Sequence, residues 1–486
     1  MGLFKRIADA FRKPKPTRRR NYTAGKSSLI TSSWTTTTMT ADQVVRAYLR
    51  PLRARSREQV ENNDYARRFI SMIKTNVVGP KGIILQSKTN RSNGTADKPA
   101  RDAIEAAWRD WGKGCDITES LSWTEMQCLF ISTVAMDGEF FARKIRGSGK
   151  YGFLIQLIDP ELIDVEYNKI TPDGFIRAGI EYDRLSRPIA YHVSVDNDPE
   201  SYSFNGKRYV RIPANEIVHR YVVERVGQKR GIPWMATALL RMNMLNGYED
   251  AAVIASRIGA SKMGFYTSET GANYAGDDDG SGNLITEVEP GLFEQLPNGT
   301  KLETFDPTYP HEQYAAFVKA CLRGIASGLG VSYNTLGNDL EGVNFSSIRA
   351  GVLEDREVFK GIQEWMIDKF NRVIFNEWMD MALLVGIPIG NNGAVLNRAS
   401  GDRYKNVSWQ PRRWSWVDPK KDIDANVIAI DRNIRSTSSV IRELGGDPDD
   451  VFSEIAEERA KMKEMGITPE IVMNQMGATN DQDPQE

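Results

Sequence analysis

The chain has 486 residues, 41% of them hydrophobic, and ten tryptophans, which excludes a globally disordered protein. Its formal net charge of −1 hides an asymmetry, because residues 1–60 carry fourteen Lys and Arg against three Asp and Glu, whereas residues 441–486 carry four against twelve. A basic front and an acidic tail suggest contacts with polyanions or with a partner surface, and two solvated termini are an equally good explanation.

The three cysteines, Cys115, Cys128 and Cys321, are odd in number and widely spread. They fit buried thiols in a reducing compartment better than a disulfide framework. No run of about 18 apolar residues is present, so no membrane partner is expected. The opening residues lack the continuous apolar stretch of a signal peptide, and we expect the chain to be soluble and intracellular when it is made.

The first expected elements are a flexible arm and a helical front. Prolines, an arginine triplet and a Ser/Thr run predict a flexible basic arm over residues 1–40. Helical periodicity then runs as far as Gly79, with Pro51 expected to divide it into two helices. Two further helices are expected at 101–111 and 123–137.

The cations of this front could neutralise phosphates, with a solvated helix face and a free tail as the alternative. The pattern favours neither explanation over the other. The residues expected to contact DNA or a partner are Arg18, Arg19, Arg20, Arg46, Arg50 and Arg53.

A β-rich region follows the helical front. Between residues 139 and 221, β-branched and aromatic residues alternate or cluster in short runs. Turn signals such as Pro172-Asp173-Gly174 and Asn205-Gly206 separate these runs. The order of helices and then antiparallel strands predicts an α+β fold.

The next part of the chain is mainly helical and contains the most distinctive segment. A helix opened by Pro233 is followed by a turn-rich stretch at 265–310. A second helix begins near Tyr314 and runs into a glycine-studded polar loop at 328–347. Beyond it, apolar periodicity from Ile348 predicts a helix of about forty residues, roughly 55 Å long. Such a rod is expected to present a mobile loop at a fixed place.

The end of the chain is expected to hold three short helices after a turn-rich stretch. Two of them are predicted at Ser436–Leu444 and Asp447–Met465, from their capping residues and from the glycines that follow them. The last residues are expected to be frayed.

Motifs of catalysis and of metal binding are missing. The nearest match to a phosphate loop, Ala24-Gly25-Lys26-Ser27, lacks the leading glycine, and neither GxGxxG nor GxSxG occurs. The three histidines show no metal-binding spacing, and Asp277–Asp279 is more typical of a solvated acidic loop than of a cation site. We therefore expect no catalytic residue, no cofactor and no metal, and a protein that is not an enzyme.

Several segments form a specific combination, although each is weak alone. They are LRARSREQVENNDYARRFISMIKTNVVG, LIDPELID, the GIEYD and RPIAYHV strand pair, IPANEIVHRYVVERVGQKRGIPWMATAL, and WVDPKKDIDA. Together they resemble the portal proteins of tailed bacteriophages, of the lambda-like type, over most of residues 40–465. The arm, the Asp-rich insert and the acidic tail depart from the family pattern.

The resemblance implies that the chain divides into the parts of a portal subunit. These are a flexible basic arm (1–40), a wing (41–232), two stem helices (233–262 and 311–330), a clip (263–310), a tunnel loop (331–347), a long wing helix with the segment after it (348–417), a crown (418–466) and an acidic disordered tail (467–486).

The implied function is that of a passive structural channel. The subunits would form a ring of about twelve copies at one capsid vertex, with the apolar stripe of the long helix buried between neighbours. Double-stranded DNA would pass through it, without sequence specificity, during packaging and ejection. The implied partners are the terminase large subunit, the major capsid protein and scaffold, and head-completion and tail proteins. The implied location is the virion, with the host cytoplasm during assembly.

The same resemblance points to two sets of contact residues. The tunnel loop has few positive charges, only Arg349 just beyond it, so its DNA contacts are expected to be steric and sequence-blind. The expected loop contacts are Tyr333, Asn334, Asn338, Asn344 and Phe345. The expected terminase contacts in the clip are Phe293, Glu294, Gln295 and Lys301.

Two alternatives stay open at this point. A nucleic-acid-binding assembly factor that is not a portal would rely on the basic arm and the front helix. A hydrolase would build its site from scattered carboxylates and would show turnover of ATP or peptide.

Overall fold

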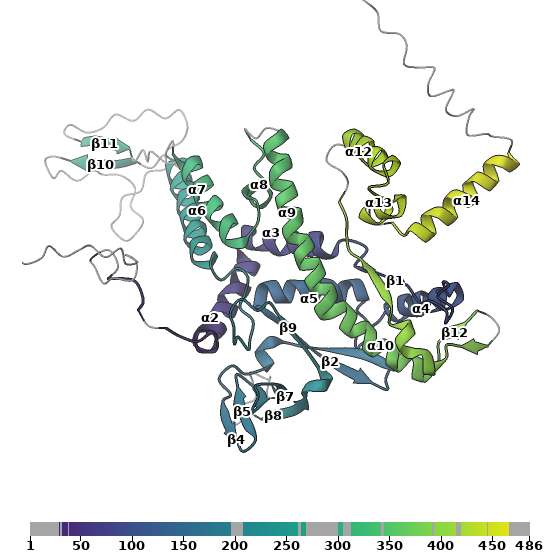
Figure 1. Cartoon of the computed structure of the whole chain (residues 1–486). Helices are drawn as coiled ribbons and strands as arrows, with labels where there is room; N and C mark the ends of the chain where they lie inside the picture. The colour runs from purple at the N-terminus through teal and green to yellow at the C-terminus, as the bar shows by residue number, and fades with distance from the viewer. Residues whose placement is uncertain are drawn as a thin grey trace, which may run out of the picture.

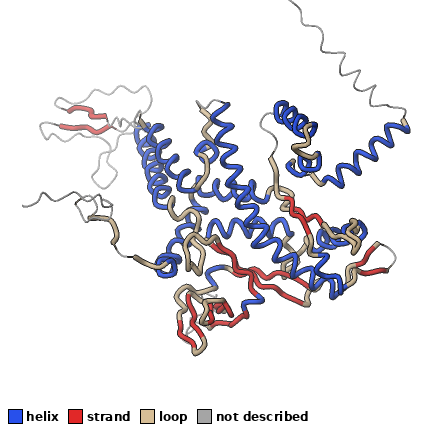
Figure 2. The backbone as a smooth tube through the Cα atoms, in the orientation of Figure 1, coloured by secondary structure: helices blue, strands red, loops and turns tan. Residues whose placement is uncertain are grey.

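The computed structural model describes residues 29, 32–36, 38–195, 208–260, 264–268, 300–304, 313–341, 345–390, 393–414, 419–444 and 446–465, some of them by backbone alone. Figure 2 shows most of the strands gathered on one side of the helices. The paired helices α6 (Leu239–Ala260) and α7 (Tyr314–Leu329) stand at one side of the molecule, and three small helices stand at the other (Figure 1). Within the described residues, no helix combines the length and the apolar character needed to cross a membrane.

Four helices form the front of the described chain: α2 (Ala41–Asn62), α3 (Asp64–Ile73), α4 (Lys98–Trp111) and α5 (Trp123–Asp137). A π-helical turn (Lys74–Val78) extends α3. The expected division at Pro51 is wrong, because α2 continues through this residue and stops at Asn63. Buried Leu49 and Arg53 anchor the helix on both sides of the proline. The Asn63 side chain accepts two N–H bonds from the first turn of α3, so the break falls there.

Two antiparallel sheets follow and confirm the predicted β-rich region. The first has the order β3-β2-β9 and comprises β2 (Glu139–Arg146), β3 (Phe153–Ile158) and β9 (Ile217–Tyr221). The second runs in chain order through β4 (Lys169–Thr171), β5 (Gly174–Arg177), β6 (Ile180–Asp183), β7 (Pro188–Ser194) and β8 (Tyr209–Pro213). A small core that includes Phe141, Ile180 and Tyr191 joins the two sheets. The chain is therefore of mixed helix and sheet, as predicted.

Three short strand pairs complete the sheets. They are β1 (Ile84–Ser87) with β14 (Val407–Gln410), β10 (Gly264–Ser268) with β11 (Thr300–Thr304), and β12 (Pro388–Ile389) with β13 (Ala394–Val395). The β10–β11 pair lies at the end of the α6–α7 pair (Figure 1).

One helix of the second half begins later than predicted. The helix expected to open at Pro233 begins six residues later, at Leu239. The backbone N–H of Trp234 donates to the carbonyl of Ala135 in α5 instead of starting a helix. The three small helices occur as expected, as α12 (Pro419–Asp431), α13 (Thr437–Glu443) and α14 (Pro448–Glu464), and α11 (Gly401–Tyr404) is a single turn.

The long helix is confirmed. It comprises α9 (Phe345–Met366), a π-helical turn (Ile367–Asn371) and α10 (Arg372–Val385), which follow one another without a break. Its second half is buried inside its own subunit. The Phe370 ring stacks on Phe130 of α5 at 4.1 Å, and Trp378 meets Trp108 of α4 edge-on at 5.0 Å. The expectation that neighbouring subunits bury the whole apolar stripe is therefore wrong for this half.

A buried group of charges joins the helical front to both sheets. Glu139 of β2 is fully buried and accepts hydrogen bonds from Arg53 of α2 and from Arg230, both at 2.6 Å. The Nε2 of His219 in β9 lies 3.0 Å from the same carboxylate. Burial alone would raise the pKa of Glu139, but the two guanidiniums and His219 outweigh it and hold that pKa well below its usual range. Burial lowers the pKa of His219, so its Nε2–H donates to Glu139 from a neutral ring.

Arg230 connects this group of charges to the five-stranded sheet. Its Nη1 donates to the carbonyl of Ile163, at 3.1 Å, and to that of Ala178. Two glycines make the approach possible. A Cβ on Gly138 would lie 2.4 Å from the backbone of Ile232, and a Cβ on Gly231 would lie 1.9 Å from the Gly138 carbonyl oxygen. The chain can bring Arg230 beside Glu139 only because both positions lack a side chain.

Replacing Glu139 by Gln should lower the free energy of unfolding of the subunit by about 3–5 kcal/mol, because it leaves two buried guanidiniums without a counter-charge. The matched control Glu216→Gln removes a partly exposed carboxylate 2.8 Å from Arg143 and should cost about 0–1 kcal/mol. Urea unfolding followed by circular dichroism measures both. Equal costs for the two variants would contradict the role given to Glu139.

Candidate functional site

The predicted tunnel loop begins at a defined helix stop. Helix α7 ends at Gly330, which has a φ of 67°. The N–H of Gly330 donates to Ser327 and that of Val331 donates to Ala326, the pair of bonds that closes a Schellman motif. The glycine therefore serves to end α7 and to turn the chain toward α9.

A single helical turn, α8 (Tyr333–Gly337), occupies the middle of the segment, and one carboxylate of the long helix holds it. Asp355 of α9 is buried and accepts the backbone N–H of Ser332 at 2.9 Å and its hydroxyl at 2.6 Å. Thr335 adds a hydroxyl 3.3 Å from the same carboxylate. Leu336 is buried in the main core. The segment is thus fastened to α9 by polar contacts and to the core by an apolar one.

Two cations from α7 lie along the other side of the segment. The guanidinium of Arg323 lies 5.4 Å from the centre of the Tyr333 ring, and the ammonium of Lys319 lies 3.1 Å from Asp339. The Tyr333 hydroxyl donates to Asp339 at 2.6 Å. This bond, with that from Lys319, lowers the pKa of Asp339 to about 2, so the carboxylate is ionised at neutral pH.

Residues 332–341 of the predicted glycine-studded loop are therefore not all loop, because they include the helical turn α8 and bonds to Asp355. Their mobility stays a prediction. Two of the glycines that suggested a mobile loop have other structural roles. Gly330 ends α7, and Gly337 packs against the Tyr333 ring. The long helix also begins earlier than expected, at Phe345, inside the predicted loop.

The structure places the five predicted loop contacts as follows. Tyr333 and Asn334 are half-buried, and Asn338, which ends α8 with a φ of 50°, is exposed. Asn344 lies outside the described residues. Phe345 is described by its backbone alone, as the first residue of α9. The three described side chains come from one short stretch, with Asn338 open to contact.

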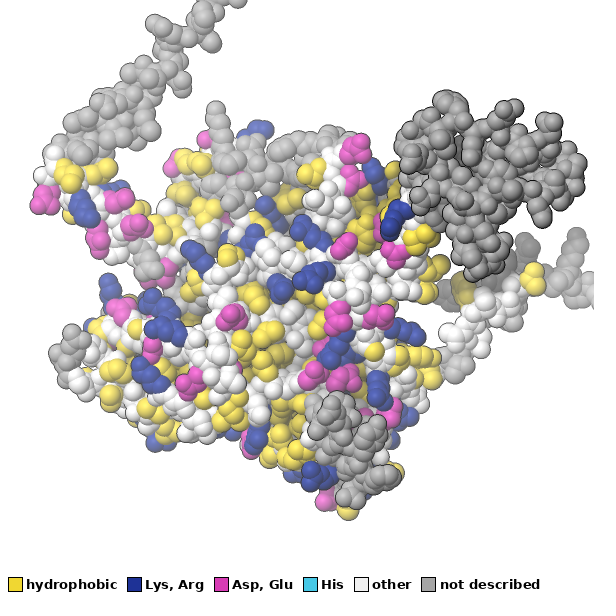
Figure 3. Space-filling view, turned by 180° about the vertical axis from the view of Figure 1, so that it is seen from behind, with side chains coloured by type: hydrophobic (Ala, Val, Ile, Leu, Met, Phe, Trp, Pro, Cys, Tyr) yellow, Lys and Arg dark blue, Asp and Glu magenta, His cyan; other side chains and the backbone are white. Residues whose placement is uncertain are grey.

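The structure does not bring the predicted basic contact residues together. Arg46 and Arg50 are exposed on α2, with Arg50 3.3 Å from Glu166. Arg53 is wrong as a contact with DNA or a partner, because it is buried and paired with Glu139 and with Glu161. Arg18, Arg19 and Arg20 lie outside the described residues. On the face seen from behind, the cations and carboxylates of the described residues are interspersed (Figure 3).

The predicted clip contacts are hardly described. Phe293, Glu294 and Gln295 lie outside the described residues, and Lys301 belongs to β11 with only its backbone described. No group of His, Cys, Asp or Glu side chains suited to a metal ion occurs among the residues that the structure describes.

Three charged residues that contact this segment were not predicted from the sequence, because charges were expected only inside the loop. They are Lys319, Arg323 and Asp355. Lys319 and Arg323 are spaced by four residues, which places both on one face of a helix, so this pair offered a usable signal. Asp355 offered none, because an acidic residue on a long amphipathic helix is ordinarily solvated.

Replacing Asp355 by Ala should loosen residues 332–341, because the N–H and hydroxyl of Ser332 lose their acceptor. Hydrogen exchange of these amides should speed up by about tenfold or more. The neighbouring variant Glu354→Ala, which alters an exposed side chain of α9, should leave exchange unchanged. Unchanged exchange in Asp355→Ala would show that the segment does not depend on this carboxylate.

Comparisons with known proteins bear on the whole chain. A family model described as "Phage portal protein, lambda family" matches residues 28–363. The "Probable portal protein" of Halomonas phage phiHAP-1 is 34% identical over 492 residues, covering 96% of this chain and 94% of the relative. "Portal protein B" of Escherichia phage lambda is 21% identical over 462 residues, covering 86% and 84%. A chain of the structure "Neck of empty GTA particle computed with C6 symmetry" has a TM-score of 0.43 and 13% identity, covering 81% of this chain and 93% of that one.

These matches decide between the alternatives. Portal proteins are structural proteins, so the prediction that the chain is not an enzyme is confirmed and the hydrolase alternative is wrong. The non-portal assembly factor is excluded by the same matches. With a family model that covers more than half of its length and a relative at 34% identity over almost all of it, this chain belongs to the lambda family of phage portal proteins.

Proposed function

We propose that copies of this portal protein form a ring of about twelve subunits at one capsid vertex, around a channel for double-stranded DNA. The observation that supports ring formation is the uncovered apolar face of the α6–α7 pair. Leu240 and Met244 of α6 are 72% and 67% exposed, and Phe317 of α7 is 50% exposed. They border a hollow of about 670 Å³. A single subunit leaves this face in water, whereas a closed ring covers it on every copy.

The stem, clip and other parts follow the same division as above. Helices α6 and α7 act as the stem, and the hairpin β10–β11 belongs to the clip. The front helices, both sheets and the long helix act as the wing, and α12–α14 act as the crown. The clip docks the terminase large subunit and later head-completion and tail proteins, with Phe293, Glu294, Gln295 and Lys301 as contacts. The wing meets the major capsid protein and the scaffold. The protein works in the virion after assembly in the host cytoplasm.

The segment at 331–347 contacts DNA in the channel, through Tyr333, Asn334, Asn338, Asn344 and Phe345. The charges on and beside its described residues favour weak contacts with the duplex. The cations Lys319 and Arg323 are offset by Asp339 and Glu341, so few phosphates are neutralised and little counterion release favours tight binding. A weakly attractive wall that is held in position suits a channel through which DNA has to slide.

Electron micrographs of the purified full chain should show annular particles with a central hole wide enough for duplex DNA. The double variant Leu240→Glu with Met244→Glu should reduce the rings to single subunits, measured by light scattering, because it places charge in the buried face between copies. The matched control Val226→Glu alters a fully exposed apolar residue outside the α6–α7 pair and should keep the rings.

Two results would overturn the ring. One is a wild-type chain that stays a compact monomer at every concentration. The other is a double variant that forms rings as well as the control does, which would remove the α6–α7 face from the interface. Far-ultraviolet circular dichroism should show that both variants stay folded.

A further inference from the structure

Three side chains at the edge of the five-stranded sheet form a row across its strands. Ile170 of β4 pairs with Phe175 of β5, and Phe175 pairs with Tyr182 of β6. Residues directly opposite each other on antiparallel strands share one face of the sheet, so the row lies on one face. The Phe175 and Tyr182 rings stack at 5.4 Å. Figure 1 shows β4 and β5 at the lower edge of the molecule, away from the small helices.

Two cations lie against this row. The Nζ of Lys229 is 5.6 Å from the centre of the Phe175 ring and 5.3 Å from that of Tyr182. The guanidinium of Arg177, which follows Phe175 by two residues on the same face of β5, is 5.8 Å from the centre of the Phe175 ring. These five residues, with Ile170, are called the Phe175 patch below.

The patch has more positive charge than the chain itself neutralises. Within the described residues, neither Arg177 nor Lys229 forms an ion pair with a carboxylate. Burial raises the pKa of Tyr182, and the charge of Asp42, at the start of α2, contributes to the same shift. One carboxylate at this distance leaves an excess of positive charge beside the Phe175 ring. Because like charges repel, an added negative charge would be stabilised there.

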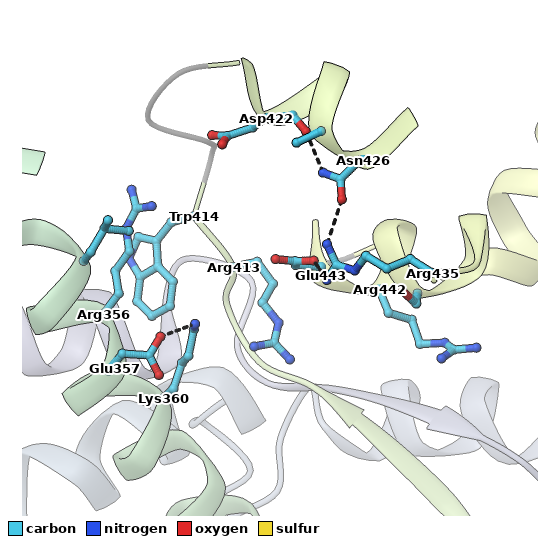
Figure 4. A pocket seen from close by; sticks show the side chains of 13 residues that line it. Arg356, Glu357, Lys360, Arg413, Trp414, Asp422, Asn426, Arg435, Arg442 and Glu443 are labelled. Carbon is cyan, nitrogen blue, oxygen red and sulfur yellow. Dashed lines mark hydrogen bonds and ion pairs between the residues drawn. The ribbon is translucent and has the colours of Figure 1, made fainter. Parts of the chain in front are cut away.

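The hollow between α9 and the small helices shows no such cluster (Figure 4). It measures about 710 Å³. On its walls, Lys360 lies 2.6 Å from Glu357. Arg435 is paired with Glu443, and Arg442 is directed away from the hollow. Its cations therefore do not meet at one place, as Arg177 and Lys229 do at the Phe175 ring.

We propose that the Phe175 patch docks an acidic segment of a partner protein. A carboxylate of this segment binds Arg177 and Lys229 through charge-assisted hydrogen bonds, and an apolar side chain of the segment covers Ile170. Strand β4 is an edge strand of its sheet, so an extended segment beside it can also bond to the backbone of β4.

The exposed isoleucine favours a protein over a nucleic acid as the partner. Ile170 is 83% exposed, whereas Tyr182 in the same row is buried. The phosphates of a nucleic acid would neutralise the two cations but would leave Ile170 in water. A protein segment that combines carboxylates with an apolar residue satisfies both. Docking needs only one subunit, so it holds or fails independently of the proposed ring.

Fluorescence anisotropy of the full chain with a labelled peptide, in which pairs of glutamate alternate with leucine, tests the docking. The double variant Arg177→Gln with Lys229→Gln should weaken binding by about tenfold or more, because the carboxylates lose both charged donors. The matched double variant Lys81→Gln with Arg109→Gln removes the same charges from exposed positions outside the patch and should bind as the wild type does.

The variant Ile170→Ser tests the apolar contact separately. It should weaken binding of the leucine-containing peptide by about threefold to tenfold. A second peptide, with serine in place of each leucine, should bind this variant and the wild type equally. Because Ile170 is largely exposed, the change should leave the circular dichroism of the chain as it is.

Four results would overturn the proposal. The wild type could fail to bind the acidic peptide, or the two double variants could lose binding equally. The variant Ile170→Ser could bind the leucine-containing peptide as tightly as the wild type does. A short DNA duplex could bind through Arg177 and Lys229 while the acidic peptide does not, which would make the patch a nucleic-acid site. Circular dichroism of each variant excludes loss of folding as the cause.

Discussion

The pairing of buried Glu139 with Arg53 and Arg230 is the interaction on which the rest of the subunit depends. These residues come from α2, from β2 and from the stretch that leads to α6, and Arg230 also donates to the five-stranded sheet. Taking three charges and a histidine out of water is costly, so the arrangement persists only with each partner in place. The cluster therefore fixes how the helical front meets both sheets. It requires glycine at positions 138 and 231, because a side chain at either position would clash with the backbone.

From this cluster a chain of rigid contacts leads to the segment proposed to touch DNA. Strand β2 follows directly from α5, and α5 supplies Phe130, which stacks on Phe370 of the long helix. The same long helix carries Asp355, whose carboxylate holds Ser332 and Thr335. The position of this segment is thus set by the core through α9. A ring of such subunits would present identical, fastened segments to the DNA.

Some of this architecture could be predicted because its causes are local. Apolar periodicity identified the long helix, alternation and turn residues identified the strands, and caps identified the small helices at 436–444 and 447–465. Arg53 could not be placed, because its decisive partner, Glu139, is 86 positions away and both look like surface charges in the sequence. The helix through Pro51 and the carboxylate at Asp355 depend likewise on tertiary packing. The role in DNA passage came from the family pattern, since few local motifs in the chain carry it.

We propose that, in the ring, residues 331–341 face the channel and are held there by α9. A cryo-electron microscopy map of the assembled full chain tests it most directly. We expect density for α8 at the inner wall, with Asn338 toward the axis and Asp355 in contact with Ser332. A map in which this segment lies on the outer surface, or is enclosed between subunits away from the channel, would contradict it.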